Sequence, residues 1–263
     1  MQNSAFYKVW RILYPLIIYF LMDVIIVWAI EALAPAKSAE GFAGFFSANI
    51  AAIASVVFLA VSIPVFYSIY KRDYNQPSWW LIKKPGYAAL LLIIGALASN
   101  GLSSLISVLN LDSIVGNYNE IQNAVFAANP VLVILQTVIL APLSEELLFR
   151  GIVFKRLQGY FDNFWLPAIV SSAIFGLYHL NLAQGIFAFL FGMLLCAVYD
   201  KLKNLWAPVI IHAGGNLISV VLVYSGISYI SPTLYLVLMI VCLAAAWALY
   251  YFCIRPLKIE SSR

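Results

Sequence analysis

Long hydrophobic runs separated by short polar segments dominate this chain. A transmembrane helix needs about 20 mostly apolar residues, and eight runs of this kind occur. They cover roughly residues 10–33, 44–70, 86–110, 129–157, 164–181, 184–200, 205–225 and 231–254. The pattern predicts an all-α fold, a polytopic membrane bundle of about eight transmembrane helices.

The composition agrees with this prediction. Hydrophobic residues make up 64% of the chain and charged residues 10%, whereas a soluble domain is about 45–50% apolar and about 25% charged. No basic stripe is long enough to indicate a nucleic-acid partner. Cys196, Cys242 and Cys253 lie in apolar runs without a CxxC motif, so neither a disulfide framework nor a thiolate metal site is expected.

The basic residues predict the orientation, because cytoplasmic loops carry an excess of Lys and Arg. With eight spans and a cytoplasmic N-terminus, fourteen of the fifteen basic residues fall on the inner side and only Lys37 falls outside. The inner set is Lys8, Arg11, Lys71, Arg72, Lys83, Lys84, Arg150, Lys155, Arg156, Lys201, Lys203, Arg255, Lys258 and Arg263. We therefore expect both termini to be cytoplasmic and residues 111–128 to form the longest outer loop. The first run exceeds the length of a signal-peptide core and is expected to be a retained span.

Scarce ionisable residues are concentrated in three of the apolar runs. Glu145, Glu146 and Arg150 lie near the end of the fourth run, and the chain's only two histidines, His179 and His212, lie in later runs. Ionisable groups at bilayer depth are costly and usually mark function. At about 1.5 Å of rise per residue, Glu145, His179, His212 and Asn216 could meet near the middle of the membrane.

The spacing within the fourth run predicts a division of roles. Arg150 follows Glu146 by four residues, which is the spacing of an ion pair on one helix face. Since successive residues advance by about 100° around a helix, Glu145 should point elsewhere, into a cavity where it could act as a general base. Pro142 is expected to kink this helix beside Glu145, although an ordinary kink without a functional role is equally compatible with the pattern.

The two later motifs each place two polar or aromatic side chains on one helix face. Phe175 precedes His179 by one turn, and His212 precedes Asn216 by one turn. The glycines at 214–215 are expected to allow close approach of a neighbouring helix. Either histidine alone could simply bond a backbone carbonyl, but the gathering of all the scarce polar groups in three motifs favours a shared site.

The three motifs resemble those of the CPBP (Abi) intramembrane protease family, whose eukaryotic relatives are the type II CAAX prenyl endopeptidases. The family pattern is EExxxR, FxxxH and HxxxN on successive membrane helices, and it corresponds here to residues 145–150, 175–179 and 212–216. The resemblance covers about residues 129–225. This part is expected to be the catalytic core of a single membrane domain that comprises residues 1–263.

The resemblance implies a role for each signature position. Glu145 and His179 would activate a water molecule. His212 and Asn216 would hold the oxyanion or orient the site. Glu146 and Arg150 would have a structural role, and Phe175 would support the site.

The resemblance leaves the cofactor open. Glu145, His179 and His212 would make a two-histidine, one-carboxylate set that is plausible for a divalent metal such as zinc. The HExxH motif is absent, and the family has also been described as using glutamate-activated water without a metal.

Three functions are compatible with these patterns. The first is an intramembrane endopeptidase of the CAAX protease-like metalloendopeptidase class, which cleaves a membrane-associated protein or peptide in a bacterial cell membrane. It would serve in bacteriocin maturation or immunity, signal-peptide processing or CAAX-type processing. The second is a non-catalytic scaffold or regulator of a partner protein, which would keep its phenotype after Glu145→Gln. The third is a small-solute or proton transporter, which would give flux in liposomes without peptide cleavage.

Overall fold

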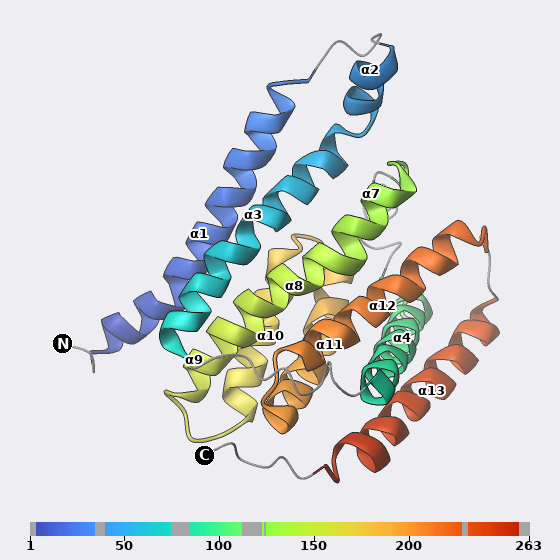
Figure 1. Cartoon of the computed structure of the whole chain (residues 1–263). Coiled ribbons are helices and arrows are strands. Elements are labelled where there is room, and N and C mark those ends of the chain that lie inside the picture. The colour runs from blue at the N-terminus through green and yellow to red at the C-terminus, as the bar shows by residue number, and fades with distance from the viewer. Residues whose placement is uncertain are drawn as a thin grey trace. The chain divides into compact units, whose positions relative to one another are not determined.

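The computed structural model describes residues 4–34, 40–74, 85–111, 123, 125–227 and 231–257. Within these ranges the regular elements are helices and there is no strand (Figure 1). Seven helices are long and apolar enough to cross a membrane by length and composition. The prediction of an all-α polytopic membrane bundle is confirmed. Most of the predicted outer loop at 111–128 lies outside the described residues.

The chain divides into two compact units. Unit 1 comprises Met1–Asn75 and Glu120–Asp162, and unit 2 comprises Gln76–Asn119 and Asn163–Arg263. The segment predicted to form the catalytic core, residues 129–225, draws on both units. The single membrane domain therefore stays a prediction.

Unit 1 is built around α3, which contacts α1 and most of the segments of the Pro130–Gln158 span. Asn49, at the start of α3, accepts a hydrogen bond through Oδ1 from the backbone N–H of Asn129 at 2.6 Å, which joins the start of α3 to the start of α7. The helices of unit 1 are α1 (Ala5–Glu31), α2 (Gly41–Ala48), α3 (Ile50–Asp73), α7 (Pro130–Ile134), η1 (Leu135–Leu140), α8 (Ala141–Glu146), η2 (Leu147–Phe154) and α9 (Lys155–Gln158).

The irregularity expected at Pro142 takes the form of π-helical turns. Proline has no N–H to donate to the preceding turn, and the π-helical segment η1 ends at Leu140, two residues before Pro142. The N–H of Ala141 bonds the carbonyl of Gln136, five residues back. A second π-helical segment, η2, follows α8, so the short helix with the glutamate pair lies between two widened segments. Such segments are frequent at functional sites.

Unit 2 is built around α4, which packs against α12, α13 and α11, while α10 pairs with α11. The apolar core includes Leu91 and Ile94 of α4, Phe191 and Leu195 of α11, and Ile211 of α12. The helices are α4 (Pro85–Val108), α10 (Trp165–Tyr178), α11 (Leu182–Leu202), α12 (Trp206–Tyr224), α13 (Pro232–Leu249) and η3 (Tyr250–Ile254).

The predicted fifth span, residues 164–181, is shorter than expected. The corresponding helix, α10, has 14 residues and ends at Tyr178, whereas a span needs about 20. Leu180 has a positive φ of 53° that stops the helix, and the side chain of Asn181 then caps α11 by accepting from the N–H of Gln184 at 3.1 Å. The described residues therefore hold seven long spans rather than eight, and the cytoplasmic placement of both termini stays a prediction.

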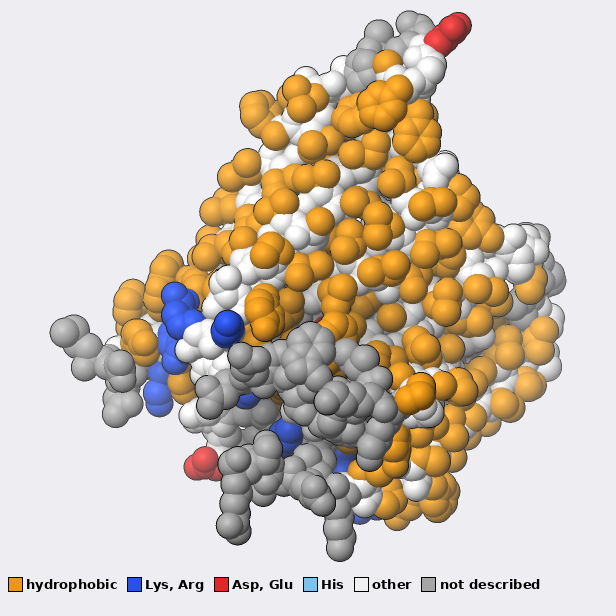
Figure 2. All heavy atoms as spheres, viewed as in Figure 1, with side chains coloured by type: hydrophobic (Ala, Val, Ile, Leu, Met, Phe, Trp, Pro, Cys, Tyr) orange, Lys and Arg blue, Asp and Glu red, His pale blue; other side chains and the backbone are white. Residues whose placement is uncertain are grey.

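Large apolar side chains lie exposed along the helices of both units. Trp28 of α1 is 70% exposed, and Trp247 of α13 is 61% exposed. Hydrophobic side chains cover much of the visible face in the space-filling view (Figure 2). Extended exposed apolar surface of this kind is typical of protein that contacts lipid, and the helices define a multi-pass membrane protein.

Candidate active site

A buried ion pair joins the end of α8 to η2 in unit 1. The guanidinium Nη1 of Arg150 lies 2.9 Å from Oε1 of Glu146, and both side chains have 0% exposed surface. The predicted pairing across four residues is confirmed. Arg150 lies in the π-helical segment η2 of the Pro130–Gln158 span, and its place on the inner side of the membrane stays a prediction.

Glu145 lies next to a group of buried hydroxyls that the sequence analysis missed. Glu145 itself is only 7% exposed. The neighbouring Ser144 has its Oγ 2.5 Å from Oγ of Ser62 and 3.4 Å from the phenol oxygen of Tyr19. Ser62 donates to the carbonyl of Leu59 at 2.7 Å. These contacts join α8 to α3 and α1, so they hold the backbone that carries Glu145 against two other helices.

The two histidines lie against the same aromatic ring in unit 2. The ring centroid of Phe175, on α10, is 5.2 Å from that of His179 and 6.0 Å from that of His212. His212 also contacts Phe191 of α11, at 5.9 Å between centroids. All three contacts have an edge-to-face geometry, which aromatic pairs favour. The structure therefore brings together His179 at the end of α10 and His212 on α12, with Phe175 in contact with both.

Close helix packing places His212 beside α4. A Cβ added to Gly95 would lie 1.9 Å from the carbonyl oxygen of Ile211, and one added to Gly214 would lie 2.3 Å from that of Leu92. Neither position has room for a side chain. The packing role predicted for the glycines at 214–215 is confirmed, since a Cβ on the second glycine would lie 3.0 Å from the ring of Phe191.

Asn216 follows His212 by one turn on α12 and is partly buried. The predicted third motif thus lies on one face of one helix. Glu145 belongs to unit 1, whereas His179, His212 and Asn216 belong to unit 2. The predicted meeting of the carboxylate with the imidazoles joins two units and stays a prediction.

The resemblance leaves open whether a divalent metal is bound. Among the residues that the structure describes, no set of three or more His, Cys, Asp or Glu side chains could hold a metal ion. The candidate set of Glu145, His179 and His212 draws on both units, so it stays a prediction.

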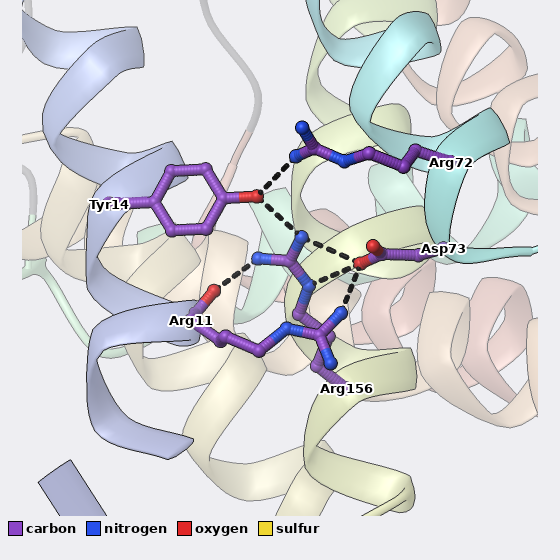
Figure 3. Close-up of polar contacts among 5 residues, drawn as sticks. All are labelled: Arg11, Tyr14, Arg72, Asp73 and Arg156. Carbon is purple, nitrogen blue, oxygen red and sulfur yellow. Dashed lines mark hydrogen bonds and ion pairs between the residues drawn. The ribbon is translucent and has the colours of Figure 1, made fainter. Parts of the chain in front are cut away.

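A second polar group in unit 1 also escaped the sequence analysis (Figure 3). Asp73, the last residue of α3, binds two guanidinium groups through Oδ2, with Nη2 of Arg11 at 2.7 Å and Nη2 of Arg156 at 2.6 Å. The phenol oxygen of Tyr14 accepts from Arg156 at 2.8 Å and from Arg72 at 3.1 Å. Each arginine was predicted to be on the cytoplasmic side, but no local spacing indicated their convergence on Asp73.

Comparison with known proteins supports the family resemblance. Residues 127–218 match the family model described as type II CAAX prenyl endopeptidase Rce1-like. The chain is 30% identical over 98 residues to the "Putative membrane peptidase YdiL" of Bacillus subtilis (strain 168), which covers 37% of this chain and 39% of that protein. It is 28% identical over 164 residues to the UPF0177 protein YbdI of Lactococcus lactis subsp. lactis (strain IL1403), which covers 62% of this chain and 85% of that protein.

A third relative is an uncharacterized 24.3 kDa protein of Escherichia coli, 35% identical over 89 residues, which covers 31% of this chain and 40% of that protein. The chain spans about two fifths of the length of the Bacillus subtilis and Escherichia coli relatives. No solved structure matches the chain significantly. The predicted resemblance to the CPBP (Abi) family is confirmed over residues 127–218, and the matches support a membrane protease in general.

Proposed function

We propose that the protein is an intramembrane endopeptidase that hydrolyses a peptide bond of a membrane-associated protein or peptide. The observation that carries the proposal is the contrast between two adjacent buried carboxylates inside the segment that matches the Rce1-like family. Glu146 is held by Arg150 in a fully buried ion pair, whereas Glu145 is 7% exposed and is displaced from Glu146 by about 100° around the helix. One carboxylate is therefore structural, and the other is the candidate base.

In the proposed reaction, Glu145, assisted by His179, takes one proton from a water molecule as the water oxygen attacks the carbonyl carbon of the substrate. His212 and Asn216 donate hydrogen bonds to the oxyanion that forms. The proton is then transferred to the leaving nitrogen as the C–N bond breaks, which yields a carboxylate and an amine. Each step uses side chains of this chain and one water molecule.

The aromatic contacts in unit 2 support the role of the histidines. Phe175 touches both imidazole rings, and Phe191 contacts His212 from α11. Rings held in this way have little rotational freedom left to lose when a substrate binds. Catalytic groups that are already oriented lower the barrier to reaction. Phe175 is thus a positioning residue in the proposal.

The test uses the full chain in its own membrane. Cells with the wild-type protein are compared with cells with Glu145→Gln by quantitative proteomics of membrane peptides. We expect at least one membrane peptide to accumulate uncut in the variant. Asp23→Asn is the matched control, because it neutralises a carboxylate of a membrane span that lies outside the three motifs; it should leave the peptide pattern unchanged.

The outcome also separates the alternative functions. A scaffold or regulator would retain its phenotype with Glu145→Gln, and no peptide would accumulate. A small-solute or proton transporter would give flux in proteoliposomes that the variant lowers, again without a change in peptides. Either result would remove hydrolysis as the function.

The proposal extends to location and partners. The relatives named above are bacterial proteins, and the seven apolar helices are suited to a multi-pass location. We therefore place the protein in a bacterial cell membrane, with lipid around the helices and a membrane-embedded or membrane-associated peptide as substrate. Bacteriocin maturation or immunity, signal-peptide processing and CAAX-type processing are the candidate reactions, and the identity of the accumulated peptide would distinguish them.

A further inference from the structure

Three helix ends of unit 1 bring guanidinium groups together around Tyr14 and Asp73 (Figure 3). We call Arg11, Arg72 and Arg156 the arginine cluster. Arg11 comes from α1, Arg72 from α3 and Arg156 from α9. The distribution of basic residues assigns all three helix ends to the cytoplasmic side of the membrane.

The arginine cluster holds more positive charge than its surroundings neutralise. Among the described residues, Asp73 is the only carboxylate in ion-pair contact with any member of the cluster, and it pairs with Arg11 and Arg156 but not with Arg72. Three positive charges therefore face one negative charge. Lys155 adds a further cation close by, with its ammonium 3.8 Å from the ring centroid of Tyr74, which follows Asp73. An additional anion at this place would relieve the repulsion between like charges.

The members of the cluster differ in how far their donors are used. Arg156 is 3% exposed and donates to Asp73, Tyr14 and the carbonyl of Arg11. Arg72 is exposed, and its hydrogen bond within the described residues runs through Nη2 to Tyr14 at 3.1 Å. A guanidinium group has five N–H donors in a planar fork that matches phosphate oxygens. Arg72 therefore keeps donors that face solvent. Arg11, with 29% of its side chain exposed, is the second member of the cluster that an external anion can reach.

The surface next to the arginine cluster indicates where such an anion comes from. Trp10, Leu13 and Ile17 of α1 are 49%, 44% and 45% exposed, and they share one helix face by their spacing. This stripe begins beside Arg11 and Tyr14 on the same helix. A lipid acyl chain along the stripe would bring its headgroup to the arginine cluster, and Trp10 has the amphipathic ring that favours the membrane interface.

We propose that the arginine cluster binds the phosphate group of an anionic phospholipid of the cytoplasmic leaflet, with Arg72 and Arg11 as the contacting residues. Basic sites between membrane helices on the cytoplasmic side are suited to anionic headgroups. Arg156 and Asp73 hold the helix ends in place and do not need to move. A soluble phosphate would share the charge chemistry but would make no use of the apolar stripe.

The experiment is a lipid titration of the purified full-length protein followed by native mass spectrometry. Phosphatidylglycerol is the anionic lipid, phosphatidylcholine is the zwitterionic comparison and inorganic phosphate is the soluble comparison. We expect phosphatidylglycerol to bind more tightly than phosphatidylcholine, and Arg72→Gln or Arg11→Gln to weaken its binding about fivefold each, as one surface charge near a membrane predicts. Arg72→Lys keeps the charge and should retain most of the binding.

Arg255→Gln is the matched control, because Arg255 is an exposed arginine beside an aromatic ring in unit 2, with its guanidinium 4.6 Å from the ring centroid of Tyr251. It should leave the affinity unchanged. Equal weakening by Arg72→Gln and Arg255→Gln would mean diffuse attraction and would overturn the proposal. The proposal would also be overturned if inorganic phosphate bound as tightly as phosphatidylglycerol and with the same dependence on Arg72 and Arg11.

Discussion

Arg150 and Glu146 form an ion pair at 2.9 Å in which neither side chain has any exposed surface. Taking two charges out of water is costly, and the pair offsets this cost only while both partners are present. The contact also ties the start of η2 to the end of α8 across one turn. The pair therefore fixes the helix on which Glu145 lies.

Breaking this ion pair should destabilise the protein strongly. We expect Arg150→Met to lower the free energy of unfolding by about 3–5 kcal/mol, because it leaves the buried carboxylate of Glu146 without its partner. Equilibrium unfolding in mixed detergent would measure the change. The double variant Glu146→Leu with Arg150→Met should recover most of the loss, since apolar residues of similar volume can replace a buried pair. A double variant no more stable than Arg150→Met would show that packing, rather than charge, sets the effect.

The two adjacent glutamates should respond differently to the same substitution. Glu145→Gln should lower the rate of peptide cleavage by about 10²–10⁴, the usual contribution of a general base, while the unfolding transition stays near that of the wild type. Glu146→Gln should instead lower stability. Cleavage of the accumulated peptide and thermal unfolding, measured on both variants, test the division of roles. If Glu146→Gln alone stopped cleavage in a stably folded protein, the roles would be reversed.

Removing the carboxylate of Asp73 should lower the free energy of unfolding more than removing the carboxylate of an exposed ion pair. Asp73→Asn removes the shared carboxylate of Arg11 and Arg156, and Arg156 has a side chain with only 1% exposed surface. We expect a loss of about 2–4 kcal/mol in the free energy of unfolding, less than for a fully buried pair because Arg11 is partly solvated.

The control for that variant is Asp200→Asn in unit 2. Asp200 pairs with Lys203 at 2.5 Å, but the two side chains are 32% and 62% exposed. Exposed pairs contribute about 0–1 kcal/mol, so this change should be close to neutral. Similar losses for the two variants would contradict a structural role for Asp73.

Close packing between α4 and α12 should be sensitive to a single methyl group. Gly95→Ala would force a Cβ against the carbonyl of Ile211, where only 1.9 Å is available, and backbone cannot move aside as a flexible side chain can. We expect a loss of about 3 kcal/mol or more in the free energy of unfolding. Gly86→Ala, near the start of the same helix, meets nothing within 4 Å and should be neutral. Detergent unfolding of the two variants side by side measures the difference, and tolerance of alanine at both positions would mean that the helices can separate without cost.

The contacts that could be predicted from the sequence are those between residues within one or two helical turns of each other. Glu146 and Arg150 are four residues apart, so their pairing follows from helix geometry alone. The links between Ser62 and Ser144 and between Tyr19 and Ser144 join residues 82 and 125 positions apart. No periodicity within an apolar run distinguishes a serine that meets a partner from one that does not. The fifth of the eight predicted spans was expected because residues 164–181 are mostly apolar, but the left-handed backbone at Leu180 ends the helix early.

By itself, the sequence determined the membrane character, the positions of seven long helices and the ion pair between Glu146 and Arg150. It also determined the family that its central motifs resemble. These properties depend on composition and on neighbours within one or two turns, which the order of residues encodes directly. Only the tertiary structure decided that Phe175 contacts both histidines, that Gly95 meets the backbone of Ile211 and that three arginines converge on Asp73 and Tyr14. Such contacts depend on the rotation and depth at which whole helices pack, and many side chains set these together.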